Sequence, residues 1–277
     1  MAIITLTTDF GEKDYFAGAV KGAIYSELNE VRIVDISHSV SPFHISEAAY
    51  IIKNAYNSFP KGSIHIIGID SELTPENKHL AVYLDEHFFI CANNGILSLL
   101  ASEINPEKIV EINIHDKIET NFPVLDVFVK VACHLARGGT LEVIGKSISE
   151  IKYLKQLEPL VNSEKNQIIG HVLYIDNYGN VVTNITRKFF ESVGKGRDFV
   201  MSARMVTFSE IYETYSDAIN FDLEKEKRGE EDGKKLAVYN SAGYIELAIY
   251  KSNPHTVGSA SSLFGLDLLD TVTINFE

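Results

Sequence analysis

The sequence predicts an α/β domain with a mainly parallel or mixed sheet, followed by a smaller antiparallel β domain. Over residues 2–69, apolar strand-like runs alternate with longer amphipathic runs in the order strand, helix, strand, helix, strand. After about residue 160 the runs become short and rich in β-branched residues, with Gly, Asn and Lys clusters between them. Residues 146–166 mix charge, a proline and polar residues, as connections do. We therefore predict domains at residues 1–160 and 161–277.

In the first domain, each expected element follows from its apolar pattern. Strands are expected at 2–7, 31–36 and 63–69, and helices at 15–28, 44–59 and 126–138, with further apolar runs at 80–85, 87–93, 94–102 and 108–114. Ligands of such sheets bind at the carboxyl ends of the strands, where Asp9 and Asp70 fall.

In the second domain, short β-rich runs separated by Gly, Asn and Lys clusters predict an antiparallel sheet or barrel. They lie at 167–176, 179–185, 198–208, 235–250 and 270–276. The charged stretch 220–234 between them predicts a solvated loop.

Composition narrows the class of protein. A net charge of −13 over 277 residues repels nucleic acid and anionic membranes, so we expect a small ligand, neutral or cationic. No apolar stretch approaches the length of a membrane helix and no basic segment precedes the first apolar run, so we expect a cytoplasmic protein. Cys91 and Cys133 lie in apolar contexts that favour reduced core thiols.

The tripeptide Asp9-Phe10-Gly11 also occurs in protein kinases, where its Asp holds magnesium. Here it has no Gly-rich strand, Lys or catalytic loop before it, so the kinase interpretation fails. An Asp at the end of a first strand can instead accept hydrogen bonds from ribose hydroxyls, or it can cap the following segment. The same two interpretations apply to Asp70, and Phe43 taken alone is typical of a core residue.

The run "YIDNYGNVVTNI" crowds polar side chains between apolar strand residues. A hairpin turn explains Asn177 and Gly179, but it leaves Asp176 and Asn184 without a reason.

Taken together, the sequence resembles the S-adenosyl-L-methionine hydroxide adenosyltransferases, which are related to the fluorinating and chlorinating enzymes. The resemblance rests on six blocks in order across nearly the whole chain: "TLTTDFGEKDYFAGAVKG", "VDISHSVSPFHISEAAYII", "FPKGSIHIIGID", "ANNGILS", "YIDNYGNVVTNI" and "NSAGYIELAI". It implies hydrolysis of S-adenosyl-L-methionine to adenosine and methionine by attack of water at ribose C5′, with no metal or cofactor. It also implies a homotrimer with the substrate between the N-terminal domain of one subunit and the C-terminal domain of the next.

The resemblance assigns roles to individual residues. Asp9 matches the carboxylate that binds both ribose hydroxyls, and Phe43 an aromatic beside the sulfonium and ribose. Asp176 matches the acid that binds the methionine amino group, Asn180 an adenine ligand, and Tyr178 an aromatic that stacks on adenine. Ser241 lies in a block that contributes to the methionine carboxylate and adenine environment.

The chain departs from the family where water is activated. Asp70 matches the Asp of an Asp-Arg-His set, but no Arg follows in "DSELTPENKHL", and Pro123 stands in place of the His. Lys78 and His79 are the candidates for substitutes, or else they are solvent-facing loop residues. The alternatives to a hydrolase are therefore a protein that binds S-adenosylmethionine or adenosine without turnover, and an enzyme with another adenosyl substrate or nucleophile.

Overall fold

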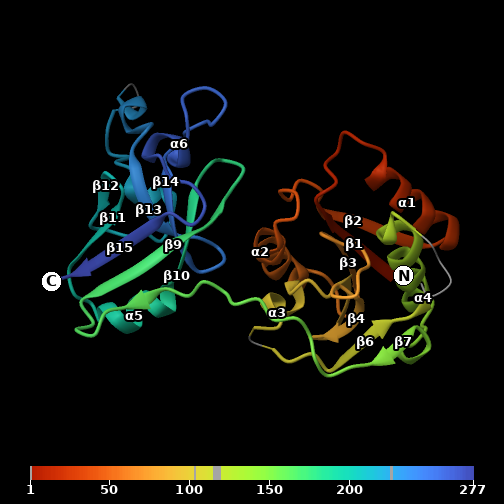
Figure 1. Ribbon diagram of the computed structural model, residues 1–277. Coiled ribbons are helices and arrows are strands. Elements are labelled where there is room, and N and C mark those ends of the chain that lie inside the picture. Colours follow the sequence, from red (N-terminus) through yellow and green to blue (C-terminus); the bar gives the residue numbers. More distant parts are fainter. Residues whose placement is uncertain (1, 103, 115–119, 225–226) are drawn as a thin grey trace. The chain divides into compact units, whose positions relative to one another are not determined.

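The computed structural model describes residues 2–102, 104–114, 120–224 and 227–277, and it divides into two compact units (Figure 1). They comprise Met1–Gln156 and Leu157–Glu277. Each unit contains its own buried apolar core, so each is described separately.

The first unit is built on a mixed seven-stranded sheet in the order β2-β1-β3-β5-β4-β6-β7. β1 pairs in parallel with β2 and β3, and β3 with β5, while the other pairs are antiparallel. The strands are β1 (Ala2–Thr8), β2 (Val31–Ser37), β3 (Ile64–Gly68), β4 (His79–Leu84), β5 (His87–Ala92), β6 (Lys108–Ile112) and β7 (Gly145–Ser147). The predicted mixed sheet is confirmed.

Helices cover both faces of this sheet. The helical segments are α1 (Phe16–Glu27), α2 (Ile45–Ala55), η1 (Tyr56–Ser58), α3 (Ile96–Leu100), η3 (Val124–Phe128), α4 (Val129–Ala136) and η4 (Leu141–Val143). One apolar cluster joins the sheet to α1, η3 and α4, and a second joins it to α2 and α3, which lie on the opposite side (Figure 1). Since both faces are covered, the central strands are largely buried, as in Ile64–Gly68, where every residue is buried.

The second unit is an eight-stranded sheet in the order β12-β11-β15-β9-β10-β14-β13, with β8 beside β9, and its strand pairs are antiparallel. Its strands are β8 (Leu160–Val161), β9 (Gln167–Ile175), β10 (Val181–Thr186), β11 (Phe199–Ala203), β12 (Val206–Phe208), β13 (Lys235–Tyr239), β14 (Tyr244–Ile249) and β15 (Thr271–Phe276). The helical segments are α5 (Arg187–Gly194), η5 (Tyr215–Ala218), η6 (Arg228–Glu231) and α6 (Ala260–Phe264). This confirms the predicted antiparallel β domain.

A few elements differ from the sequence prediction. The stretch 146–166, expected as a connection, contains the end of β7 and all of β8. The helix expected from residue 126 begins earlier, as a π-helix after Pro123, whose φ of −59° suits a helix start and which has no N–H to leave unpaired. The loop expected at 220–234 contains η6, and its residues 225 and 226 lie outside the described part of the chain. Among the described residues, no helix has both the length and the apolar character to cross a membrane.

Candidate active site

A cavity of about 600 Å³ opens in the first unit where neighbouring parallel strands end. Asp9 follows β1, Phe43 follows β2 and Asp70 follows β3. The segment before η3 closes another side. The cavity is lined by Asp9, Phe10, Phe16, Pro42, Phe43, Asp70, Ser71, Glu72, Thr120, Asn121, Phe122 and Pro123. The first domain therefore brings together three of its predicted site residues.

Asp9 is fixed by the loop that follows β2. Its Oδ2 accepts a hydrogen bond from the backbone N–H of Phe43, at 2.9 Å. Burial raises the pKa of Asp9 above its ordinary value, the backbone amides of Phe43 and Asp9 oppose this rise, and the charge of Asp70 adds to it. Asp9 can therefore still accept hydrogen bonds from a ligand in the cavity. Hydroxyl groups of a ligand would bind this half-buried carboxylate more strongly than a fully hydrated one.

Phe43 is not a core residue. Its side chain is 72% exposed and lines the cavity, and its backbone has a φ of 62°, in the left-handed region that non-glycine residues rarely adopt. This conformation coincides with the N–H contact to Asp9. Such strain is typical of binding and catalytic sites.

The loop after β3 carries Asp70 into the cavity and is held from behind by buried side chains. Asp70 has a φ of 42°. Asn94 Nδ2 donates to the carbonyl of Ile69 at 3.0 Å. Asn77 Nδ2 donates to the carbonyls of Asp70 and Glu72, at 3.0 and 3.2 Å.

His79 completes this support. Its side chain is 1% exposed, and its Nε2 donates to the carbonyl of Ser71 at 2.9 Å. The carbonyls of four consecutive residues, from Ile69 to Glu72, are therefore each bonded to a buried amide or imidazole group. This arrangement fixes the direction of the Asp70 side chain from outside the cavity.

The two predicted substitutes for the missing Arg and His lie outside the described cavity lining, and His79 contacts the Asp70 loop from behind. Among the described residues that line the cavity, neither Lys78 nor His79 occurs, while Asp70, Ser71 and Glu72 do. Lys78 is half-buried at the start of β4. Pro123, which the resemblance places where the family has a His, is buried and lines the cavity. The described lining contains carboxylates but no Lys, Arg or His.

One side of the cavity is aromatic. Phe10, Phe16 and Phe122 pack in a triangle with ring centroids 5.3 to 5.7 Å apart. A Cβ on Gly68 would lie 3.3 Å from the Phe10 ring and 3.0 Å from Val124, so a larger residue here would require these side chains to shift by a few tenths of an ångström. The cavity thus offers an apolar wall beside an acidic one, as small-molecule sites do.

The second unit contains the other predicted ligands, and they are joined by hydrogen bonds. Asp176 Oδ1 accepts from the backbone N–H groups of Tyr178 and Asn180, at 2.9 and 2.8 Å. Its Oδ2 accepts from Asn180 Nδ2 at 3.1 Å. Asp176 therefore closes the turn between β9 and β10, which gives this acid a structural reason that the sequence did not reveal.

Asn180 is 6% exposed, and its amide nitrogen also lies 3.4 Å from the hydroxyl of Tyr215. That hydroxyl donates to Glu246, which is 4% exposed and also accepts from Asn240 Nδ2. Burial raises the pKa of Glu246, against the hydrogen bonds from Tyr215 and Asn240. Because acceptors surround the NH₂ group of Asn180, its carbonyl oxygen is the group left for a ligand donor.

Tyr178 and Ser241 are exposed. Tyr178 is 67% exposed at the tip of its turn, and Ser241 lies in the turn between β13 and β14. Asn184, unexplained by the sequence, accepts from the N–H of His171 and donates to the carbonyl of Leu157, so its role is structural.

Sequence reasoning missed several members of these sites. It did not single out Glu72 in the cavity, Asn77 behind Asp70, or the Tyr215–Glu246 pair. Asn77 lies in the loop between Asp70 and His79, where the resemblance leads one to expect an Arg. Short polar side chains in loops often hydrogen-bond to nearby backbone groups, so this residue type was a usable signal. Tyr215 is 31 positions from Glu246, and no local pattern joins them.

The fold and the cavity define a two-domain protein, α/β then antiparallel β, with an acidic small-molecule site at the strand ends of the first domain. Family models extend this description. Residues 4–145 match the SAM hydroxide adenosyltransferase N-terminal domain, and residues 170–273 match the C-terminal domain of the same family. The chain belongs to the SAM hydroxide adenosyltransferase family, which confirms the resemblance.

Individual relatives cover almost the whole chain at modest identity. A protein of Methanocaldococcus jannaschii named (R)-S-adenosyl-L-methionine hydrolase is 25% identical over 98% of this chain and 95% of its own. A fluorinase of Actinopolyspora mzabensis is 24% identical over 89% and 90%. The crystal structure of an uncharacterized conserved protein from Thermotoga maritima superposes with a TM-score of 0.81 at 25% identity, covering 99% of this chain and 100% of its own.

Proposed function

We propose that this chain hydrolyses S-adenosyl-L-methionine to adenosine and L-methionine. The observation that carries the proposal is the cavity in which Asp9 and Asp70 meet at the ends of adjacent parallel strands, in a chain of this family. The relatives named as (R)-S-adenosyl-L-methionine hydrolases support it.

In this proposal, water attacks C5′ of the ribose in line with the sulfonium. The new bond joins the water oxygen to C5′, the C5′–S bond breaks, and its electron pair goes to sulfur, so that methionine leaves as a neutral thioether. Asp70 orients the water and accepts a proton from it. The protein must hold the water about 3 to 3.5 Å from the carbon and remove its hydration.

The remaining residues bind the substrate. Asp9 accepts hydrogen bonds from the ribose hydroxyls, and Phe43 packs beside the ribose and sulfonium. In the second unit, Asn180 and Tyr178 take the adenine, Asp176 takes the methionine amino group, and Ser241 contributes to the methionine carboxylate and adenine environment. His79, which contacts the Asp70 loop from behind, supports Asp70 rather than touching the substrate, and Lys78 lies outside the described cavity lining.

The charge of the cavity favours this substrate and nucleophile. Carboxylates attract the cationic sulfonium, whereas they repel halide ions. A neutral water molecule enters such a site without that repulsion. This argues against a halide-transferring reaction in this chain.

Single turnover in water enriched with heavy oxygen tests the proposal. Excess protein is incubated with S-adenosylmethionine, and any adenosine is analysed by mass spectrometry. Label in the 5′ hydroxyl is the expected result, and Asp70→Asn should keep binding but lose most of the rate. Absence of adenosine above a protein-free control would contradict the proposal.

A second candidate is a protein that binds S-adenosylmethionine or adenosine without turnover. Pro123 favours it, because a proline at the position matching the family His has a side chain that can neither bind water nor accept a proton. Calorimetry showing affinity for either ligand, with intact S-adenosylmethionine recovered from the complex, would favour this candidate. Turnover of another adenosyl compound, or reaction with another nucleophile, would indicate instead that the altered Asp70 loop selects a different substrate or nucleophile.

We also propose that the reaction needs no metal or cofactor and that the chain works as a cytoplasmic homotrimer. The sulfonium is already a good leaving group, so a rate unaffected by EDTA is expected. The trimer is supported by the family resemblance and by the division of the predicted ligands between two units. Light scattering after size-exclusion chromatography measures the trimer, and cell fractionation measures the location.

A further inference from the structure

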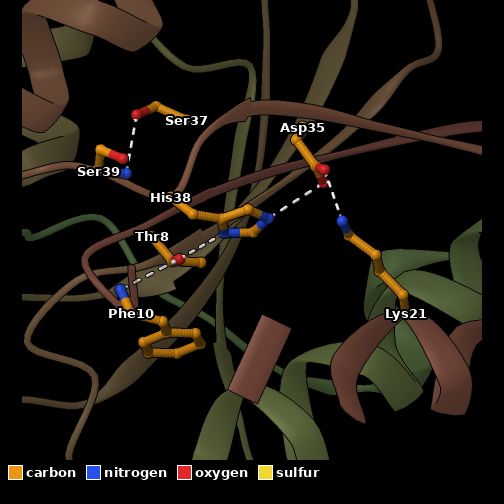
Figure 2. Close-up of polar contacts among 7 residues, drawn as sticks. All are labelled: Thr8, Phe10, Lys21, Asp35, Ser37, His38 and Ser39. Atoms are coloured by element: carbon orange, nitrogen blue, oxygen red, sulfur yellow. Dashed lines mark hydrogen bonds and ion pairs between the residues drawn. The ribbon is translucent and has the colours of Figure 1, made fainter. Parts of the chain in front are cut away.

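A line of polar side chains runs from helix α1 to the loop that carries Asp9 (Figure 2). Lys21 Nζ lies 2.5 Å from Asp35 Oδ2, and His38 Nε2 lies 3.1 Å from Asp35 Oδ1. The other ring nitrogen of His38, Nδ1, is 2.7 Å from Thr8 Oγ1. His38 and Thr8 are 5% and 1% exposed.

The partners fix the direction of these contacts. The backbone N–H of Phe10 donates to Thr8 Oγ1 at 3.3 Å, so the hydroxyl proton of Thr8 is free to point to His38 Nδ1. With Nδ1 accepting from Thr8, the other ring nitrogen, Nε2, is the one that faces the Asp35 carboxylate. Burial alone would raise the pKa of Asp35, but the hydrogen bond from Lys21 and the nearby His38 ring outweigh it and lower the pKa. Asp35 thus places a negative charge 3.1 Å from Nε2, and this charge, without an aligned hydrogen bond, favours the observed orientation of the imidazole ring.

This line ends beside the proposed ribose ligand. Thr8 immediately precedes Asp9, and the backbone N–H of Gly11 donates to the carbonyl of His38 at 2.7 Å. Gly11 has a φ of 67°, which glycine adopts without strain. With the bond from Phe43 N–H to Asp9, the loops after β1 and β2 are joined by contacts on both sides of Asp9.

We propose that His38, oriented by Asp35, is a positioning residue that sets the Asp9 carboxylate for the ribose hydroxyls of the adenosyl substrate. The proposal rests on the proposed function. His38 is not among the described residues that line the cavity, so it acts through Thr8 and the loop backbone. Because Asp9 binds the ribose in the ground state and the transition state alike, misplacing it raises KM and leaves kcat nearly unchanged.

The same strand provides a matched control. Thr5 Oγ1 lies 2.7 Å from His65 Nδ1, the same kind of contact at the same distance, and Thr5 is 0% exposed. His65 packs among Tyr56, Phe59, His87 and Phe89 in the core. Thr5→Val and Thr8→Val thus each remove one buried threonine hydroxyl bonded to a histidine, but only Thr8 belongs to the line that reaches Asp9.

The test compares His38→Leu, Thr8→Val, Thr5→Val and the conservative variants His38→Asn and Thr8→Ser. His38→Leu and Thr8→Val should raise KM for S-adenosylmethionine about tenfold with kcat within about twofold, since one bond near a charged group is lost. Thr8→Ser should keep the wild-type KM, because serine retains the hydroxyl. His38→Asn should raise KM less than His38→Leu does, because an asparagine oxygen can replace Nδ1 as acceptor. Thr5→Val should leave KM within about twofold. A general loss of folded protein would lower kcat without raising KM.

Amide hydrogen exchange of peptides covering residues 9–11 gives a second readout that needs no substrate. Exchange should be faster in His38→Leu and Thr8→Val, but unchanged in Thr5→Val. Unchanged exchange and KM in the first two variants, or an equal rise of KM in Thr5→Val, would overturn the proposal. If the wild-type protein neither binds nor cleaves S-adenosylmethionine, the proposed function fails, and the exchange rates alone decide whether His38 positions this loop.

Discussion

Asp9 is a half-buried carboxylate beside a second carboxylate, Asp70. This position serves ligand binding rather than the stability of the fold. Burial and the charge of Asp70 raise its pKa, with the amides of Phe43 and Asp9 opposing them. When folding raises the pKa of an acid, the ionised form of that acid is less favourable in the folded chain than in the unfolded chain. At neutral pH, where Asp9 is ionised, its charge therefore lowers the free energy of unfolding.

Asp9→Asn should consequently weaken binding without loss of stability. The amide oxygen can still accept from Phe43 N–H, but the charged acceptor for the ribose hydroxyls is gone. We expect adenosine affinity to fall at least tenfold, since hydrogen bonds to charged groups contribute roughly 1.5 to 3 kcal/mol each. Thermal unfolding should occur at an equal or higher temperature. Calorimetric titration and melting curves measure both, and unchanged affinity would remove Asp9 from the ribose site.

The sequence could place some site residues and not others for identifiable reasons. Asp9 and Asp70 follow apolar strands, and the ends of parallel strands meet at one edge, so their meeting in one cavity follows from the pattern. Phe43 alone suggested a core residue, because a residue type does not show that a left-handed backbone turns its ring outward. Asn77 and His79 act on backbone carbonyls, and no spacing rule announces such contacts.

At the scale of elements, the loop after β3 works as a rigid support for one carboxylate. Its carbonyls are bonded to Asn94, Asn77 and His79, and Thr74 and Asn77 close its far turn by paired backbone hydrogen bonds. A loop fixed in this way keeps Asp70 in place without a basic residue in the cavity. The order of β1, α1, β2, α2 and β3 was predictable from periodicity, but this internal bonding depends on side chains meeting across the loop.

Asn77→Ala should loosen this loop. It leaves two carbonyls without their donor, and an unmade bond at a buried group costs roughly 1 to 3 kcal/mol of stability. We expect kcat to fall about tenfold with KM within about twofold, because Asp70 orients water and does not bind substrate. Asn184→Ala, which removes a buried amide bonded to backbone in the second unit, is the matched control. Equal kinetic effects of the two variants would contradict this role of the loop.

Tyr215→Phe tests the corresponding support in the second unit. The hydroxyl lies between Asn180 and Glu246, so its loss removes one of the two contacts of the Asn180 amide nitrogen and leaves Glu246 with Asn240 as its donor. Adenosine affinity should fall about five- to tenfold, while inosine, which carries a 6-oxo group in place of the amino group, should bind weakly before and after the change. An equal change for both nucleosides, measured by calorimetry, would show that Asn180 does not select the amino group.

At the scale of the whole molecule, the first unit contains a buried pair of histidines that the second unit does not match among its described residues. His65 Nε2 lies 3.1 Å from His87 Nδ1, and the two side chains are 1% and 3% exposed. Burial, with a smaller effect of His87, lowers the pKa of His65 to about 3, and burial also lowers the pKa of His87. Each is therefore neutral in the folded protein at a pH where it would be protonated in the unfolded chain.

This pair should make the first unit sensitive to acid. A histidine whose pKa is lowered by folding stabilises fully above its unfolded value of 6.5, and that contribution falls as the pH drops from 6.5 toward 3, by up to about 1.4 kcal/mol per pH unit for His65. We expect amide exchange in residues 1–156 to quicken between pH 7.5 and 5.5, after correction for intrinsic rates, while residues 157–277 change less. His65→Gln, which keeps hydrogen-bonding groups but does not titrate, should reduce this difference. If the variant and the wild type respond equally to acid, the histidine pair does not set the acid stability of the first unit.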